Sequence, residues 1–328
     1  MAEILSRLPR GAGVAFVRLR SLGDTLLLTP AAAALKAWRP DLRLAILVEP
    51  RFAAAVAHNP DFEAVIEVPA TLSGRWNALR ALRHFRPALA LGLHGGSTAA
   101  GLVRASGATQ RATFAGLRHG WAYNLLTPPQ APPAGQARLH TVEHVLSLLT
   151  GLGLPEIAPG PLKLFVRPEA RERMRQRLAQ RGILGRYAFL STEAREPGLR
   201  WPLDRFGEVA AWLRKTHGLA SVQASAGAGE PVSGATLISG TSVEQLMAIE
   251  VEAELVVGND GGPVHIAAAL GKPVFALYST TDIEVWRPWQ AHARWCQRVP
   301  ITAILTAEVE AGIASLLADR PGETGWSS

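Results

Sequence analysis

The sequence predicts an α/β protein made of two Rossmann-like halves, on three observations. The chain has 328 residues, which exceeds the size at which one hydrophobic core keeps growing. Apolar segments rich in β-forming residues alternate with stretches of helical spacing along both halves. A run of glycines and prolines interrupts this alternation near the middle. Because parallel neighbouring strands need long crossover connections, the alternation predicts a mostly parallel sheet in each half.

The first half carries four apolar segments that we expect to be strands, at 14–19, 42–48, 64–68 and 88–93. A helix is expected over 140–152. It is followed by a cluster of helix breakers, Gly153, Pro155, Pro159, Gly160 and Pro161. This cluster puts the domain boundary within 154–167. The sequence therefore predicts an N-terminal domain of residues 1–160 and a C-terminal domain of residues 161–328.

The second half repeats the pattern. Strands are expected at 187–190, 220–223, 253–257 and 274–278, with helices after Pro202, Ser242 and Pro263. An amphipathic helix is predicted over 307–317, and the polar tail from Asp319 is expected to fray. A second, similar sheet follows from this repetition.

Composition and charge argue against a membrane-spanning, secreted, disulfide-stabilised or nucleic-acid-binding protein. Apolar runs are far shorter than the ~20 residues that span a bilayer, and no signal-peptide pattern begins the chain, so a cytoplasmic location is expected. One cysteine, Cys296, excludes an internal disulfide framework. The chain has 34 basic and 27 acidic residues, which gives a net charge of +7, and arginines cluster within 75–86 and 167–177. They form no recognisable nucleic-acid motif, so no nucleic acid is expected; we interpret them as solvated helix faces, and contact with an anionic inner membrane stays open.

The first segment that could carry chemistry leads from the first strand into the first helix. It contains Arg18, Arg20, Ser21, Gly23 and Asp24. Ligands of open α/β sheets bind at such strand ends. Gly23 permits a tight turn, and an ionised Asp24 beside a cleft can act as a general base. The alternative is that Asp24 only caps the helix.

The second segment again joins a strand to a helix through glycines. It holds Asp260, Gly261, Gly262, Pro263 and His265. N–H groups at a helix N-terminus bind phosphate, and proline suits the first helical turn. This pattern predicts a diphosphate site with Asp260 and His265 as further hydrogen-bonding groups. The alternative is a plain capped turn with a packed histidine.

A third, weaker segment is the loop 227–230, where Glu230 could bind ribose hydroxyls; a plain turn is the alternative. The loop lacks the third glycine of a dinucleotide fingerprint, which argues against an oxidoreductase. No nucleophile elbow, Walker loop, His-Glu-x-x-His or Asp-x-Asp pair is present. Nothing in the sequence therefore requires a metal.

Taken together, the segments resemble the bacterial ADP-heptose:lipopolysaccharide heptosyltransferases, glycosyltransferase family nine. The resemblance runs nearly end to end, and these stretches carry it: Leu22-Gly23-Asp24-Thr25-Leu26, Thr29-Pro30, Leu35-Lys36, Pro40, Arg200-Trp201-Pro202-Leu203, Arg205-Phe206, and Asn259-Asp260-x-Gly262-Pro263-x-His265 through Pro273. It implies the GT-B fold, in which two Rossmann-like domains face each other across a cleft. It also implies inverting, metal-independent transfer of heptose from ADP-heptose to an acceptor of the lipopolysaccharide-core type, without a cofactor, and makes Asp24 the catalytic base.

The resemblance also implies which domain binds each substrate and which residues form each site. A nucleotide-sugar is expected in the second domain and a glycolipid or glycan acceptor in the first. The acceptor-side loop comprises Arg18, Arg20, Ser21 and Gly23. The donor-binding residues are Thr192, Arg200, Glu230, Asp260, Gly261, Gly262, Pro263 and His265.

Three positions depart from the family pattern, all in the donor half. Leu199 stands where the family has a lysine, Glu193 falls in the loop that usually reads His-Pro-Gly, and Gly261 replaces a hydroxyl residue. Arg195 or Arg200 is the candidate replacement cation, although a guanidinium is not equivalent to a lysine ammonium. Two alternatives follow: a degenerate or binding-only member, and a transferase with another nucleotide-sugar or acceptor.

Overall fold

A computed structural model describes residues 3–128, 130–132 and 136–319. The chain divides into two compact units, Met1–Phe165 and Val166–Ser328. Each unit holds one six-stranded sheet whose strand pairs are all parallel. The tail that was expected to fray lies, from residue 320 on, outside the described residues.

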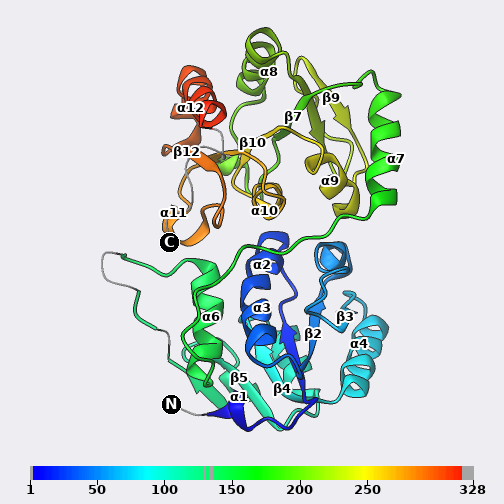
Figure 1. The fold of residues 1–328 in the computed structure, drawn as a ribbon, viewed down its shortest axis with the longest axis vertical. Coiled ribbons are helices and arrows are strands. Elements are labelled where there is room, and N and C mark those ends of the chain that lie inside the picture. Colours follow the sequence, from blue (N-terminus) through cyan, green and yellow to red (C-terminus); the bar gives the residue numbers. More distant parts are fainter. Residues whose placement is uncertain (1–2, 129, 133–135, 320–328) are drawn as a thin grey trace. The chain divides into compact units, whose positions relative to one another are not determined.

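The first unit is a doubly wound sheet with the strand order β3-β2-β1-β4-β5-β6. Its strands are β1 Gly13–Val17, β2 Arg43–Val48, β3 Ala64–Glu67, β4 Pro87–Gly92, β5 Gln110–Phe114 and β6 Leu125–Thr127. Its helices are α1 Ile4–Arg7, α2 Leu22–Leu27, α3 Thr29–Trp38, α4 Leu72–Phe85, α5 Ser97–Ala105 and α6 Thr141–Gly151, with 3₁₀ turns η1 Pro50–Ala55 and η2 Gly120–Ala122 (Figure 1).

Alternation along the strands divides the first core into two layers. Side chains of Val14 and Phe16 in β1 pack with α3 and α6, while Ala15 and Val17 face α4 and α5. All four are fully buried. Since successive strand residues point to opposite faces, a strand covered on both sides must be apolar throughout. That requirement is why these strands could be recognised as continuous apolar runs.

The second unit has the same topology, with the strand order β12-β11-β10-β7-β8-β9. Its strands are β7 Tyr187–Ser191, β8 Ala220–Ala224, β9 Ala235–Ile238, β10 Leu255–Asn259, β11 Val274–Tyr278 and β12 Ala293–Gln297. Its helices are α7 Pro168–Ala179, α8 Leu203–His217, α9 Val243–Glu250, α10 Gly262–Ala269, α11 Ile283–Trp286 and α12 Thr306–Ala318, with 3₁₀ turns η3 Pro197–Leu199 and η4 Ile301–Ala303 (Figure 1).

Helices cover both faces of the second sheet as well. Side chains of α8 and α12 pack on one face, and those of α7, α9 and α10 pack on the other. Trp201, which is 1% exposed, lies in the first of these layers, where its ring meets Phe206 edge-on with centroids 5.0 Å apart. Its indole N–H donates to the backbone oxygen of Ile304 over 3.1 Å. The Trp-Pro segment is therefore anchored in the core.

Four strands were not anticipated from the sequence: β5, β6, β9 and β12. They lie toward the outer edges of the two sheets, where β6, β9 and β12 are terminal. All four contain half-buried or exposed positions, so they lack a continuous buried apolar run. The eight predicted strands are all present, with ends shifted by up to two residues.

Glu250, the last residue of α9, is the one fully buried carboxylate side chain among the described residues. Neither carboxyl oxygen has a hydrogen-bond partner there, and burial raises the pKa of Glu250 well above its ordinary value. A group with a raised folded-state pKa contributes stability at low pH that is lost as the pH rises through that pKa.

We therefore expect Glu250→Met to raise the free energy of unfolding by about 1–3 kcal/mol at neutral pH, the cost of an unsatisfied buried polar group. The gain should grow as the pH increases above about 4.5, because only the wild-type carboxyl is then forced to stay protonated on folding. Urea denaturation at several pH values measures this. Glu244→Met on the same helix is the control, since Glu244 pairs with Arg167 at the surface. A gain that is absent or independent of pH contradicts the interpretation.

Candidate functional site

Both sheets reverse their strand order at one place, and the predicted segments follow the strands at those places. The reversal lies between β1 and β4 in the first unit and between β7 and β10 in the second. In open α/β sheets, ligands bind outside the carboxyl ends of the strands at such a switch point. Register confirms the juxtaposition, since Val17 pairs with Gly92 and Ser191 with Gly258.

Asp24 lies at the start of α2, directly after the carboxyl end of β1. Its Oδ2 accepts hydrogen bonds from the backbone N–H and the hydroxyl of Ser21, each over 3.0 Å, which forms a capping box. Its Oδ1 forms an ion pair with Arg18, and both side chains are 14% exposed. Arg18 also donates to the backbone oxygen of Leu93 after β4. The carboxylate is thus held in a fixed position at the switch point.

This geometry shows that Asp24 does cap the helix. Capping does not exclude a role as a base, because the carboxylate keeps one oxygen in contact with a replaceable hydroxyl, that of Ser21. Arg20 and Gly23, the other two residues of the predicted acceptor-side loop, lie next to Ser21 and Asp24 in the sequence. Arg20 binds Glu49 through its Nε over 2.5 Å, and Gly23 is buried in the first turn of α2.

Sequence reasoning missed two residues at this edge, His94 and Glu49. His94 follows β4, and its imidazole lies against Gly96, where an added Cβ would come within 2.8 Å of the ring. Burial lowers the pKa of His94, and the positive charge of Arg18 lowers it further. Burial favours neutral Glu49, but hydrogen bonds from Arg20 and Arg51 outweigh it and lower the pKa of Glu49. Both residues come directly after strand ends, the signal that could have found them.

A pH dependence follows from His94 and from His144, whose ring stacks on Phe114 with centroids 4.0 Å apart. Burial and then Arg18 lower the pKa of His144 as well. The pKa values of both histidines are lower in the folded chain than the unfolded value near 6.5. At a pH between these values the unfolded chain binds more protons, so the folded state loses stability as the pH falls through this range.

We expect the free energy of unfolding to decrease as the pH is lowered below about 6.5, and the slope to flatten in His94→Gln and in His144→Gln. Chemical denaturation at pH values from 5 to 8 measures the slope. His84→Gln, an exposed position, is the control and should keep the wild-type slope. An unchanged slope in both single variants would refute the assignment.

In the second unit, Asn259 joins three segments. Asn259 is fully buried at the end of β10. Its Oδ1 accepts from the backbone N–H of Trp201 over 3.0 Å, and its Nδ2 donates to the backbone oxygen of Thr192 over 2.7 Å. The loop after β7, the Trp-Pro segment and the predicted diphosphate segment are therefore fixed to one another. The sequence motif included Asn259, and the structure adds its buried linking role.

Gln223 of β8 extends the same network to Glu230. Its Nε2 donates to Oγ1 of Thr192 over 2.8 Å and to the backbone oxygen of Glu230 over 2.9 Å, and its Oε1 accepts from the N–H of Val232 over 3.0 Å. Thr192 is buried, whereas Glu230 is exposed. The structure thus brings the loops after β7 and β8 together and leaves the side chain of Glu230 accessible to solvent.

The helix α10 begins where the diphosphate site is predicted. Gly261 is its N-cap, so no side chain of the cap residue covers the first N–H groups, and Pro263 lies in the first turn. Oδ2 of Asp260 accepts from the hydroxyl of Thr281 over 2.7 Å. His265 is 3% exposed and belongs to the buried side of α10. Gly262 is half-buried at the helix start. The arrangement suits an anion at the helix N-terminus.

The two glycines before this helix, Gly258 and Gly261, differ in whether a side chain would fit in their place. A Cβ on Gly258 would lie 2.5 Å from Cβ of Ser191, so the close approach of β10 to β7 requires glycine. A Cβ on Gly261 would meet nothing nearer than Pro263 Cδ at 3.7 Å, and its backbone is extended. The hydroxyl residue that the family pattern has at this position would therefore fit.

The other two departures lie in the loop between β7 and Trp201. The carboxylate of Glu193 accepts from the hydroxyl of Ser225 over 2.6 Å, and the backbone oxygen of Glu193 would be 4.0 Å from a Cβ on Gly261. Leu199 is half-buried in η3. The two candidate cations bind within this loop: Arg200 donates to the backbone oxygen of Ala194, and Arg195 pairs with Glu196 over 3.1 Å.

Across the part of the chain that the structure describes, no three His, Cys, Asp or Glu side chains gather as a metal site would require. Within the same residues, none of the helices has the length and apolar character needed to cross a membrane.

Comparison with known proteins places these features in a family. The model described as glycosyltransferase family 9 (heptosyltransferase) matches residues 75–304. Lipopolysaccharide heptosyltransferase 3 of Escherichia coli K12 is 28% identical over 294 residues, which cover 83% of each chain. A family 9 glycosyl transferase structure from Veillonella parvula has a TM-score of 0.83 at 18% identity, covering 94% of this chain and 98% of that one.

The structure of the Escherichia coli ADP-heptose lipopolysaccharide heptosyltransferase II gives a TM-score of 0.77 at 19% identity, over 93% of this chain and 98% of the other. The predicted α/β class and GT-B-type fold are confirmed by two parallel, doubly wound sheets that match these structures. The family model covers well over half of the chain. The chain therefore belongs to glycosyltransferase family 9, the heptosyltransferase family, and is a glycosyltransferase.

Proposed function

We propose that this glycosyltransferase transfers heptose from ADP-heptose, with inversion, to an acceptor of the lipopolysaccharide-core type. The relatives support the sugar and the acceptor class, because two of them are named for lipopolysaccharide heptosyl transfer and one for ADP-heptose. The observation that carries the proposal is the position of Asp24 and of the α10 N-terminus, each at the strand-order reversal of its own unit.

In the proposed donor site, the diphosphate lies at the N-terminus of α10, where the N–H groups and the helix dipole favour negative charge. Asp260 and Glu230 accept hydrogen bonds from sugar hydroxyls, and Thr192 orders the loop between them through Gln223. Arg200 supplies the cation after leaving the backbone oxygen of Ala194, a weak contact of 3.2–3.3 Å.

In the proposed reaction, Asp24 takes the proton from the acceptor hydroxyl. The incoming hydroxyl occupies the place beside Oδ2 where the hydroxyl of Ser21 donates now. The acceptor oxygen attacks the anomeric carbon as the bond from that carbon to the diphosphate oxygen breaks, so ADP leaves on the opposite face. The negative charge that grows on the diphosphate is stabilised by α10 and by the cation. Arg18 holds Asp24 in place throughout.

The alternatives differ in nucleotide binding. Calorimetric titration with ADP, UDP and GDP distinguishes them. A heptosyltransferase of the proposed kind binds ADP in preference to UDP and GDP; a transferase with a different donor prefers another nucleotide; a degenerate member binds none. A cytoplasmic location remains part of the proposal.

Metal removal gives a further prediction. We expect turnover to persist in excess EDTA, because the helix N-terminus and a basic side chain neutralise the departing diphosphate in the proposed site. Initial rates with and without EDTA, after dialysis, measure this. Loss of turnover that magnesium or manganese restores would contradict the metal-independent mechanism.

A further inference from the structure

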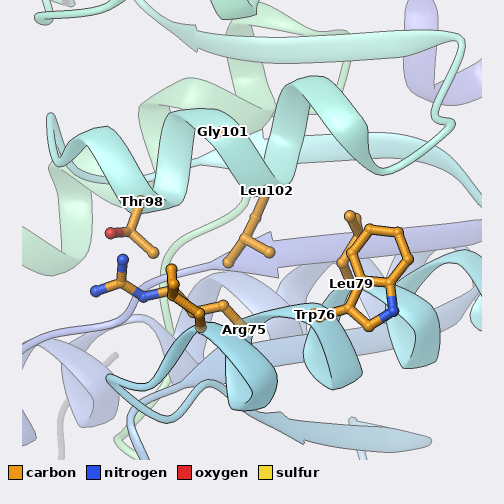
Figure 2. Close-up of a pocket in the computed structure, with 7 residues that line it drawn as sticks. Arg75, Trp76, Leu79, Thr98, Gly101 and Leu102 are labelled. Atoms are coloured by element: carbon orange, nitrogen blue, oxygen red, sulfur yellow. The ribbon is translucent and has the colours of Figure 1, made fainter.

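The helices α4 and α5 lie side by side on one face of the first sheet and enclose a shallow groove. The groove has a volume of about 270 Å³ and is lined by Leu72, Arg75, Trp76, Leu79, Thr98, Gly101 and Leu102 (Figure 2). Its lining is mostly apolar. We call this groove, together with the outward side chains of α4, the α4–α5 face.

Two large apolar side chains of this face are open to solvent. Leu72 is 84% exposed and Trp76 is 57% exposed. Positions 72, 76 and 83 are four and seven residues apart, so they share the outward side of α4. Ala78 and Leu82 are buried in the core, and half-buried Leu79 packs against that core at the edge of the groove. Moving these two neighbouring apolar side chains, Leu72 and Trp76, out of water lowers the free energy, so the face favours contact with an apolar phase.

The charge on this face has one sign. Both helices lack aspartate and glutamate, and they carry Arg75, Arg80, Arg83 and Arg104, with Arg86 as the C-cap of α4. None of these five pairs with a carboxylate among the described residues; Arg83 instead donates to the backbone oxygen of Ala105 over 2.8 Å. The face therefore keeps its full positive charge.

The second arginine cluster of the chain behaves differently. On α7, Arg171 and Arg175 pair with Glu252, and Arg173 lies 3.9 Å from Glu244. Its charge is largely neutralised inside its own unit. The expectation of a solvated, unremarkable helix face thus suits α7, whereas α4 combines unpaired arginines with an exposed tryptophan.

We propose that the α4–α5 face docks on the surface of an anionic lipid bilayer. Tryptophan and leucine enter the boundary between headgroups and acyl chains, while the arginines contact the lipid phosphates. The lone tryptophan offers no series of stacking rings for bases, which favours a lipid surface over nucleic acid. The benefit of docking rests on the proposed function, because docking would bring the enzyme to a glycolipid acceptor.

The test is sedimentation of the full chain with vesicles of phosphatidylcholine alone or of phosphatidylcholine with one quarter phosphatidylglycerol, without donor or acceptor. We expect binding only to the vesicles with phosphatidylglycerol. Replacing Arg75, Arg80 and Arg83 by glutamine should weaken it about 10²-fold at low salt, at roughly fivefold per cation near an anionic surface. Trp76→Ser should weaken it about tenfold at any salt concentration.

A matched triple on α7, Arg171→Gln, Arg173→Gln and Arg175→Gln, changes the net charge equally and should keep most of the binding. Circular dichroism establishes that all variants are folded. Equal loss in both triples would overturn the proposal, because net charge alone would then explain binding. So would no binding to the anionic vesicles, no effect of Trp76→Ser, or a larger effect of the α4 triple on binding to duplex DNA. Since no turnover is measured, these results stand apart from failure of the proposed heptosyl transfer.

Discussion

Asp24→Asn is expected to lower turnover by roughly 10²-fold or more, the usual loss when a general base is removed. Donor affinity should stay near the wild-type value, because the proposed donor-binding groups belong to the other unit. The fold should persist, since one oxygen of the amide still accepts from the N–H of Ser21. Initial rates at saturating donor and acceptor, with calorimetric titration of ADP, separate these quantities.

Because Asp24 also caps α2, the test needs a control that separates loss of the cap from loss of the base. Both carboxylate oxygens are engaged, and an amide would turn its NH₂ toward Arg18 or toward Ser21. Some loss could therefore arise from a displaced α2. Glu143→Gln removes the charge at the same capping-box position of α6, where Glu143 accepts from the N–H of His140 over 2.8 Å. It should cost stability of about 1 kcal/mol with turnover unchanged. Normal turnover of Asp24→Asn would leave Asp24 only the capping role.

Leu199→Lys, alone or combined with Glu193→Gly, is expected to tighten the binding of ADP or an ADP-sugar by tenfold or more. An ammonium beside a diphosphate forms charge-assisted hydrogen bonds worth about 1.5–3 kcal/mol. Leu199 stands two residues before Trp201, whose N–H is fixed to Asn259 at the start of the diphosphate segment. Removing Glu193 takes away a carboxylate whose backbone lies next to Gly261. Titration calorimetry at low and high salt measures the gain.

Leu184→Lys is the matched control for this prediction. Leu184 is 85% exposed and precedes β7, so it lies toward the amino end of the strands, away from the donor edge. The same change of charge there should alter affinity little. If Leu199→Lys and the double variant bind no more tightly than wild type, then either position 199 does not face the phosphates or Arg195 and Arg200 already fill the site.

The parts of the fold that sequence could predict are those in which burial dictates the pattern. β1, β2, β7 and β11 are apolar on both faces and stand out as continuous runs. β12 has the burial pattern of an edge, with Arg294 and Trp295 exposed, and nothing in its composition separates it from a loop. Pairing with β11, rather than local preference, makes it a strand.

The site divides in the same way. Asp24 and the segment around Gly262 could be found because each follows a strand and begins a helix. The place of His94 beside Asp24 and the contacts of Asn259 depend on which strands are neighbours: β4 beside β1, and β10 beside β7. A single sequence does not contain that order. The hydrogen bond of Arg18 to Leu93 spans 75 positions and illustrates the same limit.

In the proposed function, the chain moves a heptosyl group from ADP-heptose to a lipopolysaccharide-core acceptor, with Asp24 as base. Mass spectrometry of a core glycolipid acceptor, after incubation with the purified chain and ADP-heptose, tests this directly. We expect the acceptor to gain one heptose residue, ADP to be released in equal amount, and Asp24→Asn to form roughly 10²-fold less product. An acceptor mass that stays unchanged with ADP-heptose but increases with a different nucleotide-sugar would contradict it.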